Sequence, residues 1–344
     1  MVLGYNLSER YQKVLALTVE RYIRCAEPVG SRVISKCIKP PLSPATVRNI
    51  MADLEELGLL IQPHVSAGRI PTEDGFRYYI ENILDKTDLP EQTKEKIQNS
   101  LEREEIDDFS DLLKIASRIL SQVTGFPAVV TTPKLANEPL WRMDFLPLSE
   151  GLVLIVAVTR AGTVVNRLLR LSHHISMEAL TRLSEYLNSK LPTMSLEEAR
   201  DELLKEIEAD KRFLEQIFIE LEENKDKAEP IVEGVTKLLD LPEFRDTKRL
   251  KEILEAFEEK NILLKIIDRC LNCTGVQILI GEETGLCNFR NCSAVASSYK
   301  HKKTPLGGLA VIGPIRMDYS KVVPAVDYTA KILSHLLDKL GPRT

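Results

Sequence analysis

The chain has 344 residues, of which 44% are hydrophobic and 28% are charged, with 46 basic and 51 acidic side chains and a net charge of −5. This composition is ordinary for globular proteins and excludes a wholly disordered chain, and the length predicts two or three domains. The longest apolar run, Gly151–Val158, is far shorter than the ~18–20 residues that cross a bilayer. Since the first residues also lack the pattern of a signal peptide, we expect a cytoplasmic protein without membrane contacts, whose six cysteines are reduced thiols.

The charge is unevenly distributed along the chain. Residues 1–80 carry 10 basic and 8 acidic groups, a net charge of +2, whereas residues 176–260 carry 14 basic and 23 acidic groups, a net charge of −9. Because the N-terminal segment is mildly positive, the acidic total does not exclude a protein that binds nucleic acid.

The N-terminal segment predicts short helices followed by a hairpin. An apolar stripe with helical spacing runs over Tyr11–Ile23, and a second helix is expected between Gly30 and Pro40. Ser43 is suited to cap a third helix, which Gly58 ends. A short strand and a hairpin loop follow that helix.

Three short helices and a hairpin within about 70 residues are typical of a winged helix-turn-helix, which we predict over residues 1–84. Residues 85–110 are rich in charge and are expected to form a linker.

Strand-like runs begin after Pro127, stop, and then return. They are expected at Ala128–Thr132, Arg142–Leu148, Leu152–Thr159, Thr163–Leu171, Val276–Ile280, Ser293–Val295 and Leu309–Pro314. Between them, residues 175–260 are rich in Glu, Lys and Leu at helical spacing, and a final helix is expected over about Tyr319–Leu340. This order predicts an α+β domain in two segments, residues 111–174 and 261–344, with a helical domain of residues 175–260 inserted into it.

The third helix carries residues that can read DNA bases. Thr46, Arg48 and Asn49 lie off its apolar stripe, in or next to its first turn. If this turn enters the major groove, Arg can pair with guanine and Asn with adenine, each contributing about 1–3 kcal/mol of discrimination. We predict that these three residues contact bases of double-stranded DNA; the alternative is a helical subdomain whose polar face is merely solvated.

Other residues are suited to contact the DNA backbone. Ser31 and Arg32 begin the second helix and Ser43 begins the third, and helix N-termini accept phosphate oxygens. In the hairpin, Arg69 follows a small flexible tip and His64 precedes it, so both are candidates for contacts to phosphates or the minor groove. Alternatively, the hairpin is an ordinary polar loop.

Four cysteines near the C-terminus are low-probability metal ligands. Cys270 and Cys273 form a C-x2-C pair, and Cys287 and Cys292 form a C-x4-C pair, a pattern that can hold zinc or act in redox chemistry. The first pair ends an apolar helix and the second has loose spacing, which favours structural thiols, so we expect no metal and no cofactor. The common nucleotide-binding, hydrolase and metalloprotease motifs are also missing from the sequence, so an enzyme is not expected.

Several segments resemble one family, the bacterial heat-inducible transcription repressor HrcA. They are Glu27–Ser31, Ser43–Glu55, Ser66–Thr72, Gly75–Tyr79, Ser297–Tyr299, Gly307–Pro314 and Met317–Tyr319. The resemblance implies a winged-helix DNA-binding domain, a GAF-like α+β domain and an inserted helical dimerisation domain. It further implies a homodimer that binds an inverted repeat, the CIRCE element, at chaperone operons, and whose activity the GroE chaperonin maintains. A regulator that responds to a small ligand or zinc through the GAF-like domain is the alternative function.

Overall fold

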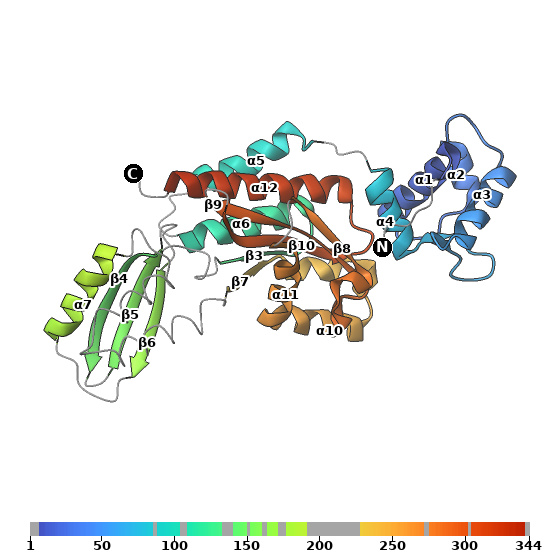
Figure 1. Cartoon of the computed structure of the whole chain (residues 1–344). Helices are drawn as coiled ribbons and strands as arrows, with labels where there is room; N and C mark the ends of the chain where they lie inside the picture. The colour runs from blue at the N-terminus through green and yellow to red at the C-terminus, as the bar shows by residue number, and fades with distance from the viewer. Residues whose placement is uncertain are drawn as a thin grey trace.

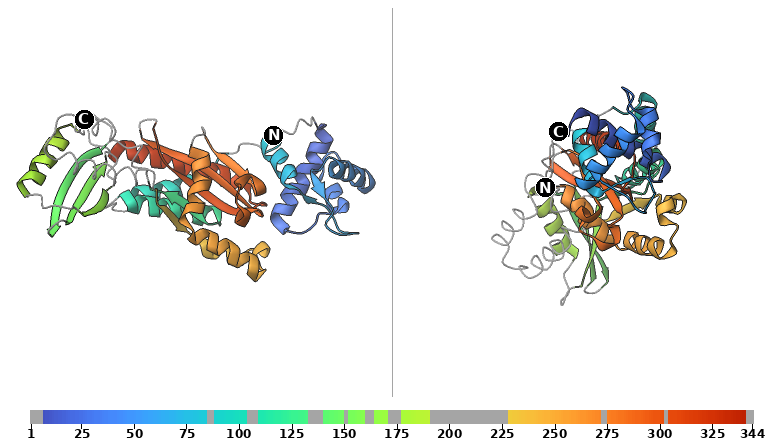
Figure 2. Two further views of the ribbon diagram at one scale, coloured as in Figure 1. Left: turned by 60° about the horizontal axis from the view of Figure 1, so that its bottom comes forward. Right: turned by 90° about the vertical axis from the view of Figure 1, so that its right-hand side faces the viewer.

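The computed structural model is a mixed α/β protein whose parts follow one another in a row (Figures 1 and 2). Helices and a hairpin form an N-terminal module, a five-stranded sheet covered by helices forms a central module, and a three-stranded sheet with one helix forms a small-sheet module. The N-terminal and small-sheet modules lie at opposite ends of the central module in Figure 1 and in the left view of Figure 2. The structure describes residues 7–84, 88–103, 109–132, 140–149, 152–159, 164–170, 177–190, 228–271, 275–301 and 304–340.

The N-terminal module contains four helices and one two-stranded ribbon. In chain order these are α1 (Glu9–Cys25), α2 (Ser31–Cys37), α3 (Pro44–Glu56), β1 (Leu60–Ile61), β2 (Ile70–Pro71) and α4 (Glu73–Asn82). The strands pair antiparallel, with Ile61 opposite Ile70. The predicted order of three helices and a hairpin is therefore present.

Local sequence explains where α3 begins and ends. The Ser43 side chain accepts a hydrogen bond from the Thr46 N–H at 3.0 Å, and Pro44 occupies the first helical position. At the other end Gly58 adopts a φ of +76°, a left-handed conformation that a glycine takes without strain. Both ends of this helix agree with the prediction.

The central module is an antiparallel sheet of order β7-β3-β10-β9-β8. Its strands are β3 (Ala128–Thr131), β7 (Pro230–Glu233), β8 (Gln277–Ile280), β9 (Cys292–His301) and β10 (Thr304–Pro314). Its helices are α5 (Glu91–Arg103), α6 (Phe109–Thr124), α10 (Thr247–Glu258), α11 (Lys260–Leu271) and α12 (Tyr319–Leu340). Four short 3-10 helices complete it: η3 (Val235–Asp240), η4 (Pro242–Phe244), η5 (Gly281–Thr284) and η6 (Cys287–Phe289).

Alternate residues of each strand pack under different helices, as the pleat requires. Val130 of β3 belongs to a core with α5, α6 and α12, whereas its neighbour Val129 belongs to a core with α10 and α11. Figure 1 shows the two sets of helices on opposite faces of the sheet. The first core continues without a break into the N-terminal module, from Leu7 to Leu337.

Gly307 and Gly308 lie inside strand β10, ahead of the expected strand at Leu309–Pro314. A Cβ on Gly307 would lie 2.4 Å from the hydroxyl oxygen of Tyr299 on the neighbouring strand. That hydroxyl donates a hydrogen bond to the Thr131 carbonyl at 2.6 Å. The glycine is thus required by a close approach rather than by a turn.

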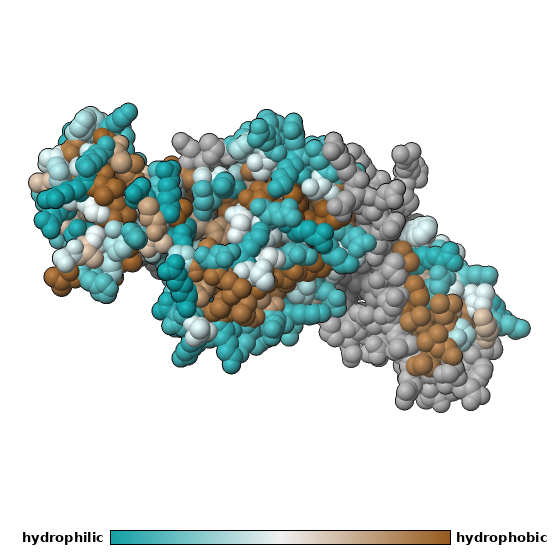
Figure 3. Space-filling model, turned by 180° about the vertical axis from the view of Figure 1, so that it is seen from behind, coloured by the Kyte–Doolittle hydropathy of each residue, from teal (hydrophilic) through white to brown (hydrophobic). Residues whose placement is uncertain are grey.

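The small-sheet module contains β4 (Leu140–Ser149), β5 (Leu152–Thr159), β6 (Val164–Arg170) and α7 (Met177–Lys190). Its three strands form an antiparallel sheet of their own. α7 lies along one face, where Asn188 accepts a hydrogen bond from the Met143 N–H at 2.7 Å. Apolar side chains gather on the outside of this module (Figure 3), and those with large exposed fractions are Trp141, Leu146, Leu148 and Met177.

Sheet membership differs from the grouping expected from the sequence. The strands between residues 140 and 170 were grouped with the later strands, yet they form the separate small sheet. Conversely β7 and α10 lie before the expected boundary of 260 but pack in the central module. A strand-like run in the sequence indicates that the segment can form a strand, but not which strand it pairs with. The predicted grouping of strands therefore differs from the observed sheets.

The chain leaves the central module after β3 and returns to it before β7. Hydrogen bonds next to these two strands mark both points. The Thr132 N–H donates to the Glu229 carbonyl at 2.9 Å, and the Glu229 N–H donates to the Thr132 hydroxyl at 2.7 Å. The chain therefore leaves the central module after Thr132 and returns at Glu229. Residues 191–227, where helices were expected, lie outside the described residues.

The described helices include none with the length and apolar character needed to cross a lipid bilayer.

Candidate nucleic-acid interface

The first turns of α3 present the three predicted base-contacting residues on one exposed surface. Val47, Ile50, Met51 and Leu54 are buried and fix the helix against α1 and α2. Thr46, Arg48 and Asn49 are exposed as a consequence. The structure thus brings these three together in the arrangement that the sequence predicted.

A hydrogen bond from α1 holds the far half of α3. The Tyr11 hydroxyl donates to the Asp53 carboxylate at 2.5 Å, and this bond raises the pKa of Tyr11. Asp53 lies two turns after Pro44, at the C-terminal side of α3. The acidic end of α3 is therefore directed towards its own module, while the end with Arg48 remains exposed.

Exposed cations lie on the preceding helix. Arg32 and Lys36 are four residues apart in α2, so they share one face, and Lys39 follows that helix. Within the described part of the chain, no carboxylate forms an ion pair with any of these three or with Arg48. Lys36 and Lys39 were missed by the sequence analysis, although their helical spacing from Arg32 could have identified them.

Ser31 and Ser43 occupy different environments. Ser31 is partly buried at the first position of α2, which has only seven residues, so its access to a phosphate is limited. Ser43 is exposed, but its hydroxyl caps α3 and lies 2.9 Å from the Thr46 hydroxyl. Ser43, at the start of α3, is thus more accessible than Ser31.

The loop between β1 and β2 carries an exposed tip. His64, Val65 and Ser66 are exposed, with Val65 at 96%, and Ser66 has a φ of +73°. Gly68 lies against the backbone of Val29, where an added Cβ would approach to 2.4 Å. The base of the loop is therefore tightly packed, and only its tip extends from the module.

Arg69 is directed back into the module, in contrast to the predicted DNA contact. Its Nε donates to the Glu55 carboxylate at 2.9 Å, and its side chain is only 15% exposed. Its backbone forms two hydrogen bonds with Val29, each 2.9 Å long. Glu55 also accepts a hydrogen bond from the Gln62 N–H at 3.0 Å. Arg69 and Glu55 together fix both sides of the loop to α3.

The cysteines differ in their surroundings. Cys287 is exposed, while Cys292 is buried in the core below β9, and burial raises the pKa of the Cys292 thiol to about 12. Cys273 lies outside the described residues, as does the side chain of Cys270. Among the described residues, no three His, Cys, Asp or Glu side chains cluster in a way that could hold a metal ion.

Comparisons with known proteins identify the family. The model of the HrcA protein C terminal domain matches residues 110–323. The chain is 41% identical to the heat-inducible transcription repressor HrcA of Geobacter sulfurreducens, over 97% of this chain and 99% of that protein. It is 40% identical to the repressor of the same name from Syntrophobacter fumaroxidans, over 98% and 99% of the two chains.

The fold is shared with one solved structure, the crystal structure of a hypothetical protein. The alignment of the two structures covers 98% of this chain and 100% of the hypothetical protein, with a TM-score of 0.64 and 23% sequence identity. The curated relatives are transcription repressors and not enzymes. The sequence-based resemblance is confirmed: this chain belongs to the HrcA family of heat-inducible transcription repressors.

Proposed function

We propose that the chain is a sequence-specific DNA-binding repressor of heat-shock chaperone operons, with the N-terminal module as a winged helix-turn-helix. The main support is the exposed first half of α3, where Thr46, Arg48 and Asn49 all lie off the buried apolar stripe. An α-helix fits the major groove, and these side-chain types match the hydrogen-bonding edges of bases.

In this proposal α3 reads bases while cations around it bind phosphates. Arg48 pairs with guanine and Asn49 with adenine, and Thr46 contacts a neighbouring base. Arg32, Lys36 and Lys39 bind the phosphate backbone and set the register of the helix in the groove. The loop tip with His64 approaches the adjacent backbone or minor groove.

The functional unit is proposed to be a homodimer on an inverted repeat of CIRCE type. A palindromic site needs two recognition helices related by a twofold axis. The exposed apolar side chains of the small-sheet module support a subunit contact there, since such patches mark association surfaces. In this assignment the central module is the GAF-like domain and residues 133–228 form the inserted dimerisation domain.

Repression follows from occlusion of the promoter by the bound dimer, without a chemical step. Modulation of the repressor by the GroE chaperonin is part of the proposal, supported by the family membership. The zinc-responsive alternative receives no support from the described residues, because Cys292 is buried among apolar core side chains and no three metal-ligating side chains cluster there.

Removal of the Arg48 side chain tests the proposal. Arg48→Ala is expected to weaken binding to an inverted-repeat operator by about 1–3 kcal/mol and to abolish discrimination at one base pair of each half-site. Fluorescence anisotropy with single-base operator variants measures both effects. Lys331→Ala removes one exposed positive charge from α12 and serves as the control, with unchanged affinity expected. Unchanged affinity and discrimination in Arg48→Ala would contradict the proposed role of α3.

A further inference from the structure

Arg77 of α4 joins the N-terminal module to the central module. Its Nε donates to Glu283 Oε1 at 3.1 Å, and its Nη2 donates both to Glu283 Oε2 and, at 2.8 Å, to the Ile278 carbonyl. The Arg77 side chain is only 19% exposed. Glu283 belongs to η5 and is itself fixed, since its carboxylate also accepts the Ile280 N–H at 2.9 Å. This contact links residues 206 positions apart in the sequence.

The turn that presents Glu283 is shaped to fit α4. The Glu73 carboxylate accepts a hydrogen bond from the Glu282 N–H at 3.2 Å. Gly281 has a φ of +53°, and a Cβ there would lie 2.0 Å from Glu73 Oε1. A side chain at this position would therefore displace Glu73, so glycine permits the close approach of the two modules.

Arg316 makes a second connection from the central module. Its guanidinium forms a bidentate pair with Glu243 of η4, with Nη2 3.0 Å from Oε2. Its Nη1 donates to the Ile23 carbonyl in the last turn of α1 at 2.8 Å. Carbonyls in the last turn of a helix lack an intrahelical partner, so this bond satisfies an otherwise open acceptor.

Aromatic rings lie between the two arginine contacts. The rings of Tyr22 and Phe76 are 6.3 Å apart, and Phe76 is 6.3 Å from Tyr319 of α12. Tyr319 is fully buried and donates from its hydroxyl to the Ile315 carbonyl at 2.7 Å. Because these rings belong to one continuous core, the modules share buried apolar surface at this point.

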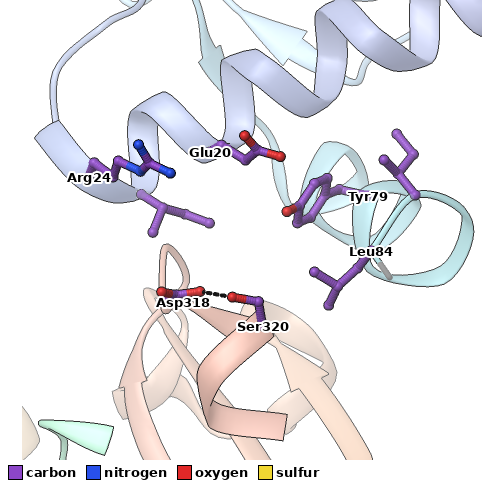
Figure 4. A pocket seen from close by; sticks show the side chains of 8 residues that line it. Glu20, Arg24, Tyr79, Leu84, Asp318 and Ser320 are labelled. Atoms are coloured by element: carbon purple, nitrogen blue, oxygen red, sulfur yellow. Dashed lines mark hydrogen bonds between the residues drawn. The ribbon is translucent and has the colours of Figure 1, made fainter. Parts of the chain in front are cut away.

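One side of the junction is open. Between α1, the end of α4 and the start of α12 lies a cavity of about 320 Å³, shown in Figure 4. Its lining residues are Glu20, Ile23, Arg24, Tyr79, Ile83, Leu84, Asp318 and Ser320. Side chains do not fill this side of the junction, and the two arginine contacts are polar connections that would oppose a tilt of the N-terminal module towards the cavity.

We propose that Arg77 and Arg316, with Glu283 and Glu243, are positioning residues that set which operator spacing the repressor accepts. In a dimer, the separation and rotation of the two α3 helices follow from the subunit interface and from the angle between N-terminal and central modules. The arginine contacts fix α1 and α4, and α3 is packed against α1 and bonded to it through Tyr11 and Asp53. The central module thus sets the orientation of α3, through its contacts with α1 and α4. This inference rests on the proposed function as a dimeric DNA-binding protein.

Spacing is a sensitive readout of that angle. Each added base pair moves a half-site by about 3.4 Å and rotates it by roughly one tenth of a turn. The affinity gained when both subunits bind depends on how well the two α3 helices match the spacing of the two half-sites. A rigid dimer therefore binds one spacer length best, whereas a dimer with loosely attached N-terminal modules binds several.

The test compares carboxylate variants that leave the N-terminal module unchanged. A Glu243→Ala/Glu283→Ala chain removes both partners, and Glu243→Gln/Glu283→Gln keeps shape and acceptors while removing charge. Asp240→Ala/Glu258→Ala is the matched control, because both side chains are exposed, lie in η3 and α10 of the central module, and form no ion pair within the described residues. Affinities of the full-length chains are measured for a single half-site and for inverted repeats whose spacer changes in steps of one base pair.

The wild type and the control are expected to bind one spacer best, with the affinity falling about tenfold or more at two base pairs from the optimum. The alanine pair is expected to lose that preference while binding the single half-site with unchanged affinity, and the glutamine pair to lie between them. Identical spacer profiles for wild type and for a folded alanine or glutamine pair would overturn the inference. Failure of the wild type to bind any inverted repeat would overturn the proposed function itself, and the inference with it.

Discussion

Under the proposed function, individual side chains near α3 serve two separate purposes, contact with DNA and support of the contacting surface. Arg48 and Lys36 are exposed, and no carboxylate of the described chain pairs with them. Arg69 is also a cation, but its side chain is only 15% exposed and is paired with Glu55. Residue type and loop position alone do not distinguish a cation that binds phosphate from one that holds the loop.

Salt dependence separates these two kinds of cation. Each phosphate contact contributes about 0.9 to the slope of log K against log salt concentration. Lys36→Ala is therefore expected to reduce the slope by about 0.9 per subunit, whereas Arg69→Ala leaves it unchanged. Arg69→Ala is instead expected to lower the free energy of unfolding by about 1 kcal/mol, since its partly buried ion pair with Glu55 is lost. A slope that falls equally in both variants would show that Arg69 contacts DNA.

At the scale of elements, the contact between α4 and η5 places carboxylates close together. Burial raises the pKa of Glu73, and the nearby acids Glu282, Glu283 and Asp74 act in the same direction, while the Glu282 N–H opposes them. A carboxyl whose pKa is raised by folding stabilises the fold below its unfolded pKa, and that contribution is lost as the pH rises through its folded pKa. At neutral pH the ionised Glu73 is thus a net cost to the fold.

Glu73→Gln should relieve that cost, with Asp74→Asn as the matched control. Both residues lie in the first turn of α4, where the helix dipole favours negative charge, so the two changes lose the same dipole interaction. We expect Glu73→Gln to unfold at a higher temperature than Asp74→Asn at pH 7, by a difference that corresponds to at most about 1 kcal/mol because Glu73 is partly solvated. The difference should shrink as the pH falls below about 4.3, the ordinary pKa of an unfolded glutamate. A difference that grows on acidification would contradict the raised pKa.

The sequence predicts elements better than it predicts their partners. The apolar period of α1 and the cap and glycine of α3 are local signals, and both helices form where expected. The strand β7 was missed because Pro230–Glu233 is short and lies in a charge-rich segment, and only its pairing with β3 makes it a strand. The candidate site shows the same limit. The exposure of Thr46, Arg48 and Asn49 can be predicted from the apolar spacing of one helix. The Arg77–Glu283 contact cannot, because no local sequence pattern relates these two residues.

In the whole molecule, the two ends have different chemistry. The N-terminal module presents exposed cations and the exposed first half of α3, and the small-sheet module at the opposite end presents exposed apolar side chains. The central module lies between them and shares one continuous core with the N-terminal module. This layout separates the proposed DNA contact from the proposed subunit contact, so that the orientation between them depends on the junction at Arg77 and Arg316.

The distribution of the net charge of −5 along the chain also bears on how the whole molecule would bind DNA. A module with a charge of only +2 in residues 1–80 makes few phosphate contacts, so a single subunit is expected to bind DNA weakly. Specific affinity then depends on two subunits and on direct contacts from α3 to bases. The acidic remainder of the chain disfavours non-specific adhesion to DNA.

The most direct test of DNA-binding repression is a gel shift of the wild-type chain over a salt series. It uses an inverted-repeat operator from a chaperone promoter and a scrambled duplex of the same length. The account predicts that the operator is bound about 10³-fold or more tightly than the scrambled duplex, with affinity falling linearly in log–log form as salt rises. Equal affinity for both duplexes, or no retention of either at low salt, would contradict it.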